Sequence, residues 1–192
     1  DRGGDITYHG PGQLTGYPIL SLPGRRGGGI AETRTYVAKI EEILIAALTD
    51  VGLPNCGRID RYPGVWVNPN STSPRKIAAI GVRLRRGRTM HGFALNVSTD
   101  LSWFDRIIPC GIGDLGVTSL QAQGIKVSME TMVKAVAKRA IDAWGADGHD
   151  QAHVVFRNAK TNLMTLSSED RRQHLEIEDL AVKEKSRETT KR

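Results

Sequence analysis

Glycine is concentrated near the start of the chain. The stretch from Arg2 to Pro18, RGGDITYHGPGQLTGYP, carries five glycines around the pair Tyr8 and His9. Glycine has more backbone freedom to lose on folding than any other residue. Five glycines in so short a stretch therefore need a structural reason. Two interpretations follow: the stretch is a flexible linker, or its backbone approaches another part of the molecule too closely for a Cβ atom.

Two segments farther along have the apolar spacing of helices. From Glu32 to Val51, apolar residues recur every three or four positions, and Gly52 follows where a left-handed capping residue is expected. A second helix is predicted from Ser128 to Trp144 and is ended by Gly145. Both apolar stripes are expected to face the core.

Strand patterns occupy the region between these helices. The predicted strands there are Gly64 to Val67, Lys76 to Arg86 and Met90 to Val97. A hairpin turn is expected at RGRT around Gly87. The opening stretch adds two strand candidates, Ile6 to His9 and Gln13 to Leu20. Together these elements predict an α/β fold of the α+β type, a mixed β-sheet with packed helices.

The chain is predicted to form one domain and a tail. Its 192 residues can bury a sizeable core, with 39% hydrophobic and 25% charged residues. The domain is expected over residues 1–156. Residues 157–192 are polar, with mixed charges, and are expected to be partly helical or disordered.

The net charge of +6 allows two kinds of partner. The tail from Ser167 to Arg192 has as many acidic as basic side chains. The excess positive charge therefore lies in the body of the chain, notably at Arg83, Arg85, Arg86 and Arg88. Such charge suits an acidic protein surface. Because no nucleic-acid motif accompanies it, we expect no nucleic-acid partner. No apolar run approaches a membrane span, so no membrane association is expected either.

Two cysteines are too few for a disulfide framework and suit a reducing compartment. Cys110 lies in IIPCGIGDLGVTSL, where Pro109 and Gly111 favour a sharp turn beside the sulfur. Backbone N–H groups there could face an oxyanion. On residue type alone, a buried and inert cysteine remains the stronger interpretation. Cys56 is expected in a loop and without a role, and no metal or other cofactor is expected.

Lys76 opens the strand KIAAIG. A lysine there is usually a surface residue, but it could instead stand beside a thiolate and favour that charged form. His9 and His91 are other candidates for a base, and a Cys–His pair would suggest hydrolysis or acyl transfer. Spacing along the chain does not choose between them.

The sequence resembles the lipoyl(octanoyl) transferases in four blocks that occur in the same order. These blocks are RGGDITYHGPGQLTGYP, KIAAIGVR, HGFALNV, and PCGI followed by VTSL. The resemblance implies a fold similar to the catalytic domains of biotin and lipoate protein ligases. It also implies transfer of an octanoyl group from acyl carrier protein to a lysine of a lipoyl domain. Members normally carry further structure before the Arg-Gly-Gly block, so part of the family domain is expected to be missing ahead of Asp1.

The resemblance also implies roles for individual residues. Cys110 would be the nucleophile that carries the acyl thioester, and Lys76 the residue that activates it. His91 is a possible additional pocket residue. The residues expected to bind the acyl substrate are Arg2, Gly3, Gly4, Asp5, Ile6, Thr7, Tyr8, His9, Ala79, Ile80, Gly81, Gly92, Phe93 and Ala94. The opening glycines would then let the backbone line a narrow acyl tunnel.

Two alternatives remain open. An ATP-dependent lipoate–protein ligase would share the fold, although GRRGGG from Gly24 to Gly29 is not a phosphate loop of the Gly-x-x-x-x-Gly-Lys type. A non-catalytic relative would only bind a carrier or lipoyl domain. The expected partners are octanoyl-acyl carrier protein as donor, with lipoyl domains of 2-oxo-acid dehydrogenase complexes and the glycine cleavage H protein as acceptors. The expected location is the cytoplasm, or a mitochondrion or plastid if a leader precedes this sequence.

Overall fold

The computed structural model describes residues 7–22, 30–106 and 115–145. The chain divides into residues 1–154 and 155–192, and every described residue belongs to the first unit. Its elements, in chain order, are β1 (Gln13–Gly16), α1 (Ile30–Asp50), β2 (Cys56–Ile59), β3 (Tyr62–Val67), β4 (Arg75–Arg85), β5 (Arg88–Asn96), η1 (Leu101–Arg106), β6 (Gly116–Val117), η3 (Gln121–Gln123) and α2 (Met129–Trp144).

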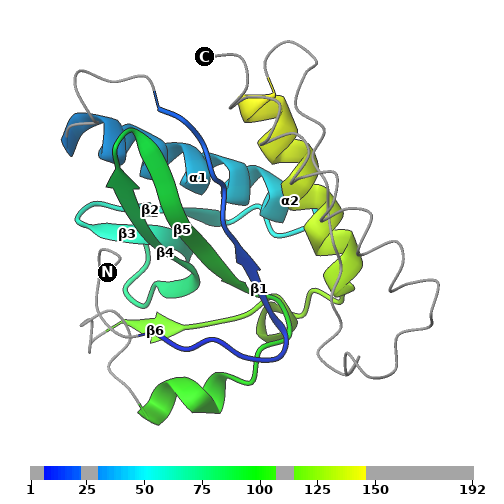
Figure 1. The fold of residues 1–192 in the computed structure, drawn as a ribbon. Coiled ribbons are helices and arrows are strands. Elements are labelled where there is room, and N and C mark those ends of the chain that lie inside the picture. The colour runs from blue at the N-terminus through cyan, green and yellow to red at the C-terminus, as the bar shows by residue number, and fades with distance from the viewer. Residues whose placement is uncertain (1–6, 23–29, 107–114, 146–192) are drawn as a thin grey trace, which may run out of the picture. The chain divides into compact units, whose positions relative to one another are not determined.

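The strands form one mixed sheet in the order β1-β5-β4-β3-β2, with antiparallel neighbours throughout this path. β6 pairs with the start of β4 in parallel. Helix α1 packs against β2, β3 and β4 and also against α2 (Figure 1). The predicted fold class, a mixed sheet with packed helices, is confirmed.

Both helix ends predicted from glycine are confirmed. At the end of α1, Leu53 N–H donates to the Leu48 carbonyl over 2.9 Å and Gly52 N–H donates to Thr49 over 3.0 Å, with Gly52 at φ 96°. This pair of bonds is the Schellman motif. Helix α2 ends at Trp144, and the N–H of Gly145 donates to the Ile141 carbonyl over 2.7 Å. At the start of α2, Ser128 accepts a hydrogen bond from the N–H of Thr131.

The central strands also match their predicted ranges to within two residues. β4 and β5 form a long antiparallel hairpin whose last pair is Arg85 with Arg88. Arg86 at φ 51° and Gly87 at φ 75° occupy the turn. Positive φ at both central positions is what a type I′ turn requires, and this turn matches the natural twist of a hairpin.

Three expectations for local structure were wrong. Thr7 to His9, the described part of one predicted strand, form no strand. The next strand ends at Gly16, four residues before the expected end at Leu20. Pro18 has no N–H to donate. Beyond it the Thr89 hydroxyl accepts from Leu20 N–H over 2.7 Å, Thr89 N–H donates to the Leu20 carbonyl over 3.0 Å, and Ser21 forms an isolated bridge with Arg88.

Cys56, expected in a loop, begins β2 and pairs with Val67. No residue near Cys56 gives a strong strand pattern, because β2 is only four residues long and contains a glycine.

The core lies between the sheet and the two helices. Ile40, Leu44 and Leu48 of α1 are fully buried against Val65 and Ile77 of the sheet. Burial of this apolar surface is the main favourable term in folding. Within the described ranges, no helix is long and apolar enough to cross a membrane.

The close backbone approach inferred from the opening glycines is confirmed for Gly16, which lies against Gly92 of β5. A Cβ on Gly92 would collide with the carbonyl oxygen of Gly16, and one on Gly16 would collide with the ring of Phe93. β1 therefore runs against β5 where neither glycine can carry a side chain.

Candidate active site

A small pocket opens at the edge where β4 leaves β5. Its lining comes from five parts of the chain and consists of Thr7, Gln13, Lys76, Ala79, Ala94, Asn96, Phe104 and Val117. Most of this surface is apolar or carries small side chains. The long cationic side chain in it is that of Lys76, which makes Lys76 the natural starting point for chemistry.

Lys76 is buried, with 7% of its surface exposed. The usual surface position of a lysine at a strand end is therefore excluded here. Its Nζ lies 4.7 Å from the centroid of the Trp66 ring, which is itself 1% exposed. An ammonium over an aromatic face is attracted by the ring quadrupole, more strongly when water is excluded.

An irregularity in β4 aims Lys76 into the pocket. Val65 pairs with Ala78, but its neighbour Trp66 pairs with Lys76, so Ile77 is an extra residue on β4. Ile77 and Ala78 both join the core, whereas Lys76 and Ala79 on either side line the pocket. In a regular strand, alternation would have placed Lys76 and Ala79 on opposite faces. This β-bulge brings Lys76 and Ala79 to the same face of the sheet.

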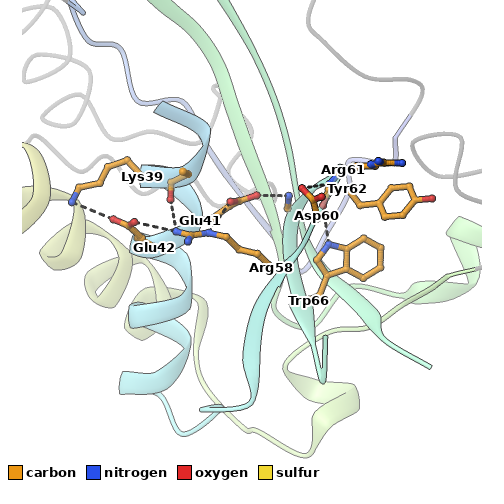
Figure 2. Close-up of polar contacts among 10 residues, drawn as sticks. Lys39, Glu41, Glu42, Arg58, Asp60, Arg61, Tyr62 and Trp66 are labelled. Carbon is orange, nitrogen blue, oxygen red and sulfur yellow. Dashed lines mark hydrogen bonds and ion pairs between the residues drawn. The ribbon is translucent and has the colours of Figure 1, made fainter. Parts of the chain in front are cut away.

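The strand opposite the bulge is held by α1. The N–H of Gly64 donates to Oε1 of Glu41 over 2.9 Å, and Nε of Arg58 lies 2.9 Å from Oε2 of the same carboxylate (Figure 2). Gly64 has a φ of 129°, a conformation that side chains rarely adopt. Arg58 also reaches Glu42 and, with Lys39, lowers the pKa of the Glu42 carboxyl by hydrogen bonding.

β6 enters beside Lys76. β5 pairs with β4 as far as Ala78, and β6 then pairs with Arg75 and Lys76. The Lys76 carbonyl accepts a hydrogen bond from Thr118 N–H over 2.9 Å. Since β3 uses the other edge of β4, β6 takes over the edge that β5 leaves.

Two amide side chains join the segments that meet here. Nε2 of Gln13 donates to Oδ1 of Asn96 over 2.9 Å, and Nδ2 of Asn96 donates to the Thr118 carbonyl over 3.0 Å. Gln13 also donates to the Tyr8 carbonyl, and its Oε1 lies 2.8 Å from Nδ1 of His9. The network thus ties the N-terminal segment to β5 and to the chain after β6.

Aromatic side chains cluster beside the pocket residue Phe104. The Tyr8 ring stacks on Trp103 at 6.0 Å between centroids and meets Phe104 edge-on at 5.5 Å. The guanidinium of Arg106 lies over the Trp103 ring, with Cζ 4.6 Å from the ring centroid. These contacts fix Tyr8 beside the pocket residue Phe104.

The structure brings together only some of the residues expected to bind substrate. Thr7, Ala79 and Ala94 line the pocket with Lys76. Phe93 instead belongs to the core, and Ile80 packs against it.

Gly81 and Gly92 pair across the hairpin, and His91 lies opposite Val82. His91, the possible additional pocket residue, does not line the described pocket. It has a φ of 62°, and its buried Nε2 has no hydrogen-bond partner within the described part of the chain.

Several expected residues lie outside the described residues. They are Arg2, Gly3, Gly4, Asp5, Ile6 and Cys110, together with the predicted tail. Their roles stay predictions.

Four pocket residues were missed from the sequence: Gln13, Asn96, Phe104 and Val117. HGFALNV ends on Asn96 and Val97, so a polar residue at the end of an apolar strand was the available signal for Asn96. Phe104 and Val117 are ordinary apolar residues whose place becomes evident only in three dimensions.

Cys56 is unsuited to nucleophilic chemistry. It packs against the core, and burial raises the pKa of its thiol to about 11. The thiolate is the reactive form, so this cysteine is almost wholly unreactive near neutral pH. Among the described residues, no group of three or more His, Cys, Asp or Glu side chains could hold a metal ion.

The fold is that of the lipoate ligase catalytic domains. A lipoate protein ligase from Thermoplasma acidophilum with bound lipoic acid superimposes with a TM-score of 0.56 at 19% identity, covering 77% of this chain and 58% of that one. A lipoate-protein ligase A bound with ATP gives a TM-score of 0.59 at 19% identity, covering 80% and 60%.

The sequence places the chain within this class more narrowly. Residues 1–141 match the lipoyl protein ligase A/B catalytic domain, and the chain belongs to this family. It is 51% identical over 145 residues to an octanoyltransferase of Mycobacterium sp. (strain KMS), covering 74% of this chain and 58% of that protein. An octanoyltransferase of Rhodococcus opacus (strain B4) is 44% identical over 171 residues, covering 83% and 63%. The chain thus spans about three fifths of the length of these relatives.

Proposed function

We propose that the chain is an acyltransferase that moves an octanoyl group from octanoyl-acyl carrier protein to a lysine of a lipoyl domain. The octanoyl group is first transferred to Cys110 as a thioester, and Lys76 accepts and returns the protons. The observation that carries this proposal is the burial of Lys76 in a narrow pocket beside Ala79 and Ala94. The similarity to octanoyltransferases supports the choice of acyl group.

Two observations support Cys110 as the nucleophile. Cys56 is disfavoured because burial raises its thiol pKa to about 11, and the chain has only two cysteines. Phe104 and Val117, which lie six and seven positions from Cys110, both line the pocket that holds Lys76. The chain therefore lies at the same pocket both six positions before Cys110 and seven positions after it.

In the first half-reaction, the Lys76 amine takes the proton of the Cys110 thiol, and the thiolate attacks the thioester carbonyl. Backbone N–H groups next to Cys110, such as that of Gly111, would stabilise the tetrahedral oxyanion. The carbon–sulfur bond to the carrier then breaks, and the Lys76 ammonium returns its proton to the leaving carrier thiolate. The octanoyl group remains on Cys110.

In the second half-reaction, the amine of the target lysine attacks the acyl-enzyme. Lys76 accepts the proton that this nitrogen loses, and the Cys110 thiolate leaves and is reprotonated. A thioester is already activated, so formation of the amide needs no ATP. The small side chains of Ala79 and Ala94, with the Gly92 backbone close by, suit a straight acyl chain.

The test is intact mass spectrometry after mixing the protein with octanoyl-acyl carrier protein in the absence of ATP. The expected result is an octanoyl adduct on Cys110 that hydroxylamine removes, because hydroxylamine cleaves thioesters. Cys110→Ser should lack this labile adduct, whereas Cys56→Ser should form it normally. Full transfer by Cys110→Ala in the carrier-dependent assay would refute the scheme.

A lipoate–protein ligase is the second candidate, because a solved structure of the same fold holds ATP. Product formed only when ATP is supplied, from free acid rather than thioester, would favour it. Tight binding of a carrier or lipoyl domain without any transfer would favour a non-catalytic relative. A cytoplasmic location remains a prediction, which fractionation of the source cells would test.

A further inference from the structure

We propose that Trp66 is a positioning residue for Lys76. The face of the Trp66 ring stabilises the ammonium form that Lys76 takes in both half-reactions. The inference rests on the proposed function only for the catalytic role of Lys76. The contact itself is structural: Nζ of Lys76 lies 4.7 Å from the Trp66 centroid, with both side chains buried.

The position of the ring is itself fixed. Trp66 Nε1 donates to the Tyr62 carbonyl over 3.0 Å, and the Tyr62 ring meets Trp66 at 6.4 Å between centroids (Figure 2). The ring is therefore held before a substrate arrives. A prearranged group stabilises charge without reorganising when the reaction occurs.

The backbone of β3 runs close to β4 beside the lysine stem. A Cβ on Gly64 would collide with the carbonyl oxygen of Ala78 at 2.5 Å and would touch Cε of Lys76 at 3.4 Å. Gly64 is held by the hydrogen bond to the buried Glu41 carboxylate, which Arg58 neutralises. Glu41 on α1 thus fixes the strand that carries both Gly64 and Trp66.

An aromatic face suits a group that must change its charge. The ring attracts the ammonium but accepts none of its protons in a strong hydrogen bond, so the proton remains transferable. The bulge at Ile77 places the Lys76 side chain on this face and turns it into the pocket at the same time. The Trp66 ring thus contributes both to the location of the Lys76 side chain and to the stability of its charged form.

Trp66→Leu and Trp66→Phe test the role of the ring face. Both variants lose the Nε1 hydrogen bond and both are apolar, but only phenylalanine keeps an aromatic face. The first readout is the rate at which acetic anhydride acetylates Lys76, followed by peptide mass spectrometry and normalised to the exposed Lys126. The neutral amine is the form that reacts, so the rate in Trp66→Leu should rise about fivefold or more, and that in Trp66→Phe by less than about twofold.

The second readout is octanoyl transfer. We expect kcat to fall about tenfold in Trp66→Leu with an unchanged KM for the donor, and Trp66→Phe to retain most of the rate. Trp144→Leu is the matched control, since Trp144 packs on Tyr36 of α1 outside the pocket. It should leave the Lys76 acetylation rate unchanged.

If Trp66→Leu fails to fold, fluorinated tryptophans replace it. They keep the shape of the ring but weaken its attraction for cations, so acetylation of Lys76 should quicken with each added fluorine. Equal acetylation rates in the leucine and phenylalanine variants, or in the fluorinated series, would overturn the inference. Because acetylation needs no substrate, it decides the role of Trp66 even if octanoyl transfer is never observed.

Discussion

The amide of Gln13 donates a hydrogen bond of 2.9 Å to Oδ1 of Asn96, and Asn96 in turn donates to the carbonyl of Thr118. One pair of amides therefore joins the N-terminal segment, the end of β5 and the chain after β6. Gln13 and Asn96 both line the pocket, where Thr7 and Lys76 are the other polar residues.

Removing the Asn96 amide should destabilise the protein. Asn96→Ala leaves the buried Thr118 carbonyl without this donor, and we expect a loss of about 1–3 kcal/mol in the free energy of unfolding. Urea denaturation followed by circular dichroism measures this change. Asn70→Ala, at an exposed position, is the control and should change stability by less than about 0.5 kcal/mol.

Gly92→Ala should destabilise through a steric clash. The new Cβ would meet the carbonyl oxygen of Gly16, which is backbone and cannot rotate away. We expect a cost of about 1–3 kcal/mol, as for other overpacked sites. Gly116→Ala is the matched control, because its Cβ would meet only Arg75 at 3.4 Å and 3.9 Å. Equal thermal melting of the two variants would contradict the close approach of β1 and β5.

Cys56 should react slowly and with a steep pH dependence. Burial raises its pKa from 9.0 to about 11, so the rate of alkylation by iodoacetamide should increase about tenfold per pH unit from pH 7 to pH 10 in the folded protein. The thiol also contributes to stability below pH 9. That contribution is lost as the pH rises from 9 to about 11, because the unfolded chain releases the proton first.

The variant Cys56→Ala should therefore lose less stability than the wild type between pH 9 and pH 11. Chemical denaturation at both pH values measures the difference. An identical pH dependence in both proteins would show that Cys56 is not desolvated.

The ion pair between Asp50 and Arg139 links the end of α1 to α2, with 2.7 Å between Oδ2 of Asp50 and Nε of Arg139. Hydrogen bonding to Arg139 lowers the pKa of the Asp50 carboxyl below 3.8. Its stabilising effect is therefore present above the unfolded value and disappears as the pH falls through the folded one. Because both groups are exposed to solvent, Asp50→Asn should have a small effect that vanishes in high salt. A large, salt-independent loss in urea denaturation would contradict this.

The sequence predicted elements with strong periodicity and clear ends. Both helices and the β4–β5 hairpin have local causes, namely apolar spacing, a capping serine and glycines at required positions. β2 and β6 are too short to give a pattern of their own, and they exist because longer strands offer an edge to pair with. The early end of β1 follows from Pro18 and the close packing on Gly92.

Prediction of the candidate site was partial for a similar reason. Lys76, Ala79 and Ala94 lie in recognisable motifs, whereas Phe104 and Val117 have no local feature that distinguishes them. Whether Lys76 lies at the surface or in a pocket depends on the bulge at Ile77. That bulge arises from pairing between strands and leaves no mark in the sequence of β4 alone.

The lining of the pocket extends along the chain from Thr7 to Val117. Contacts so distant in sequence carry a large entropic cost of loop closure and form late in folding. During synthesis, the α1 helix and the β4–β5 hairpin can form while the site is still incomplete. A chain released before β6 would thus have most of its secondary structure but lack one wall of the pocket.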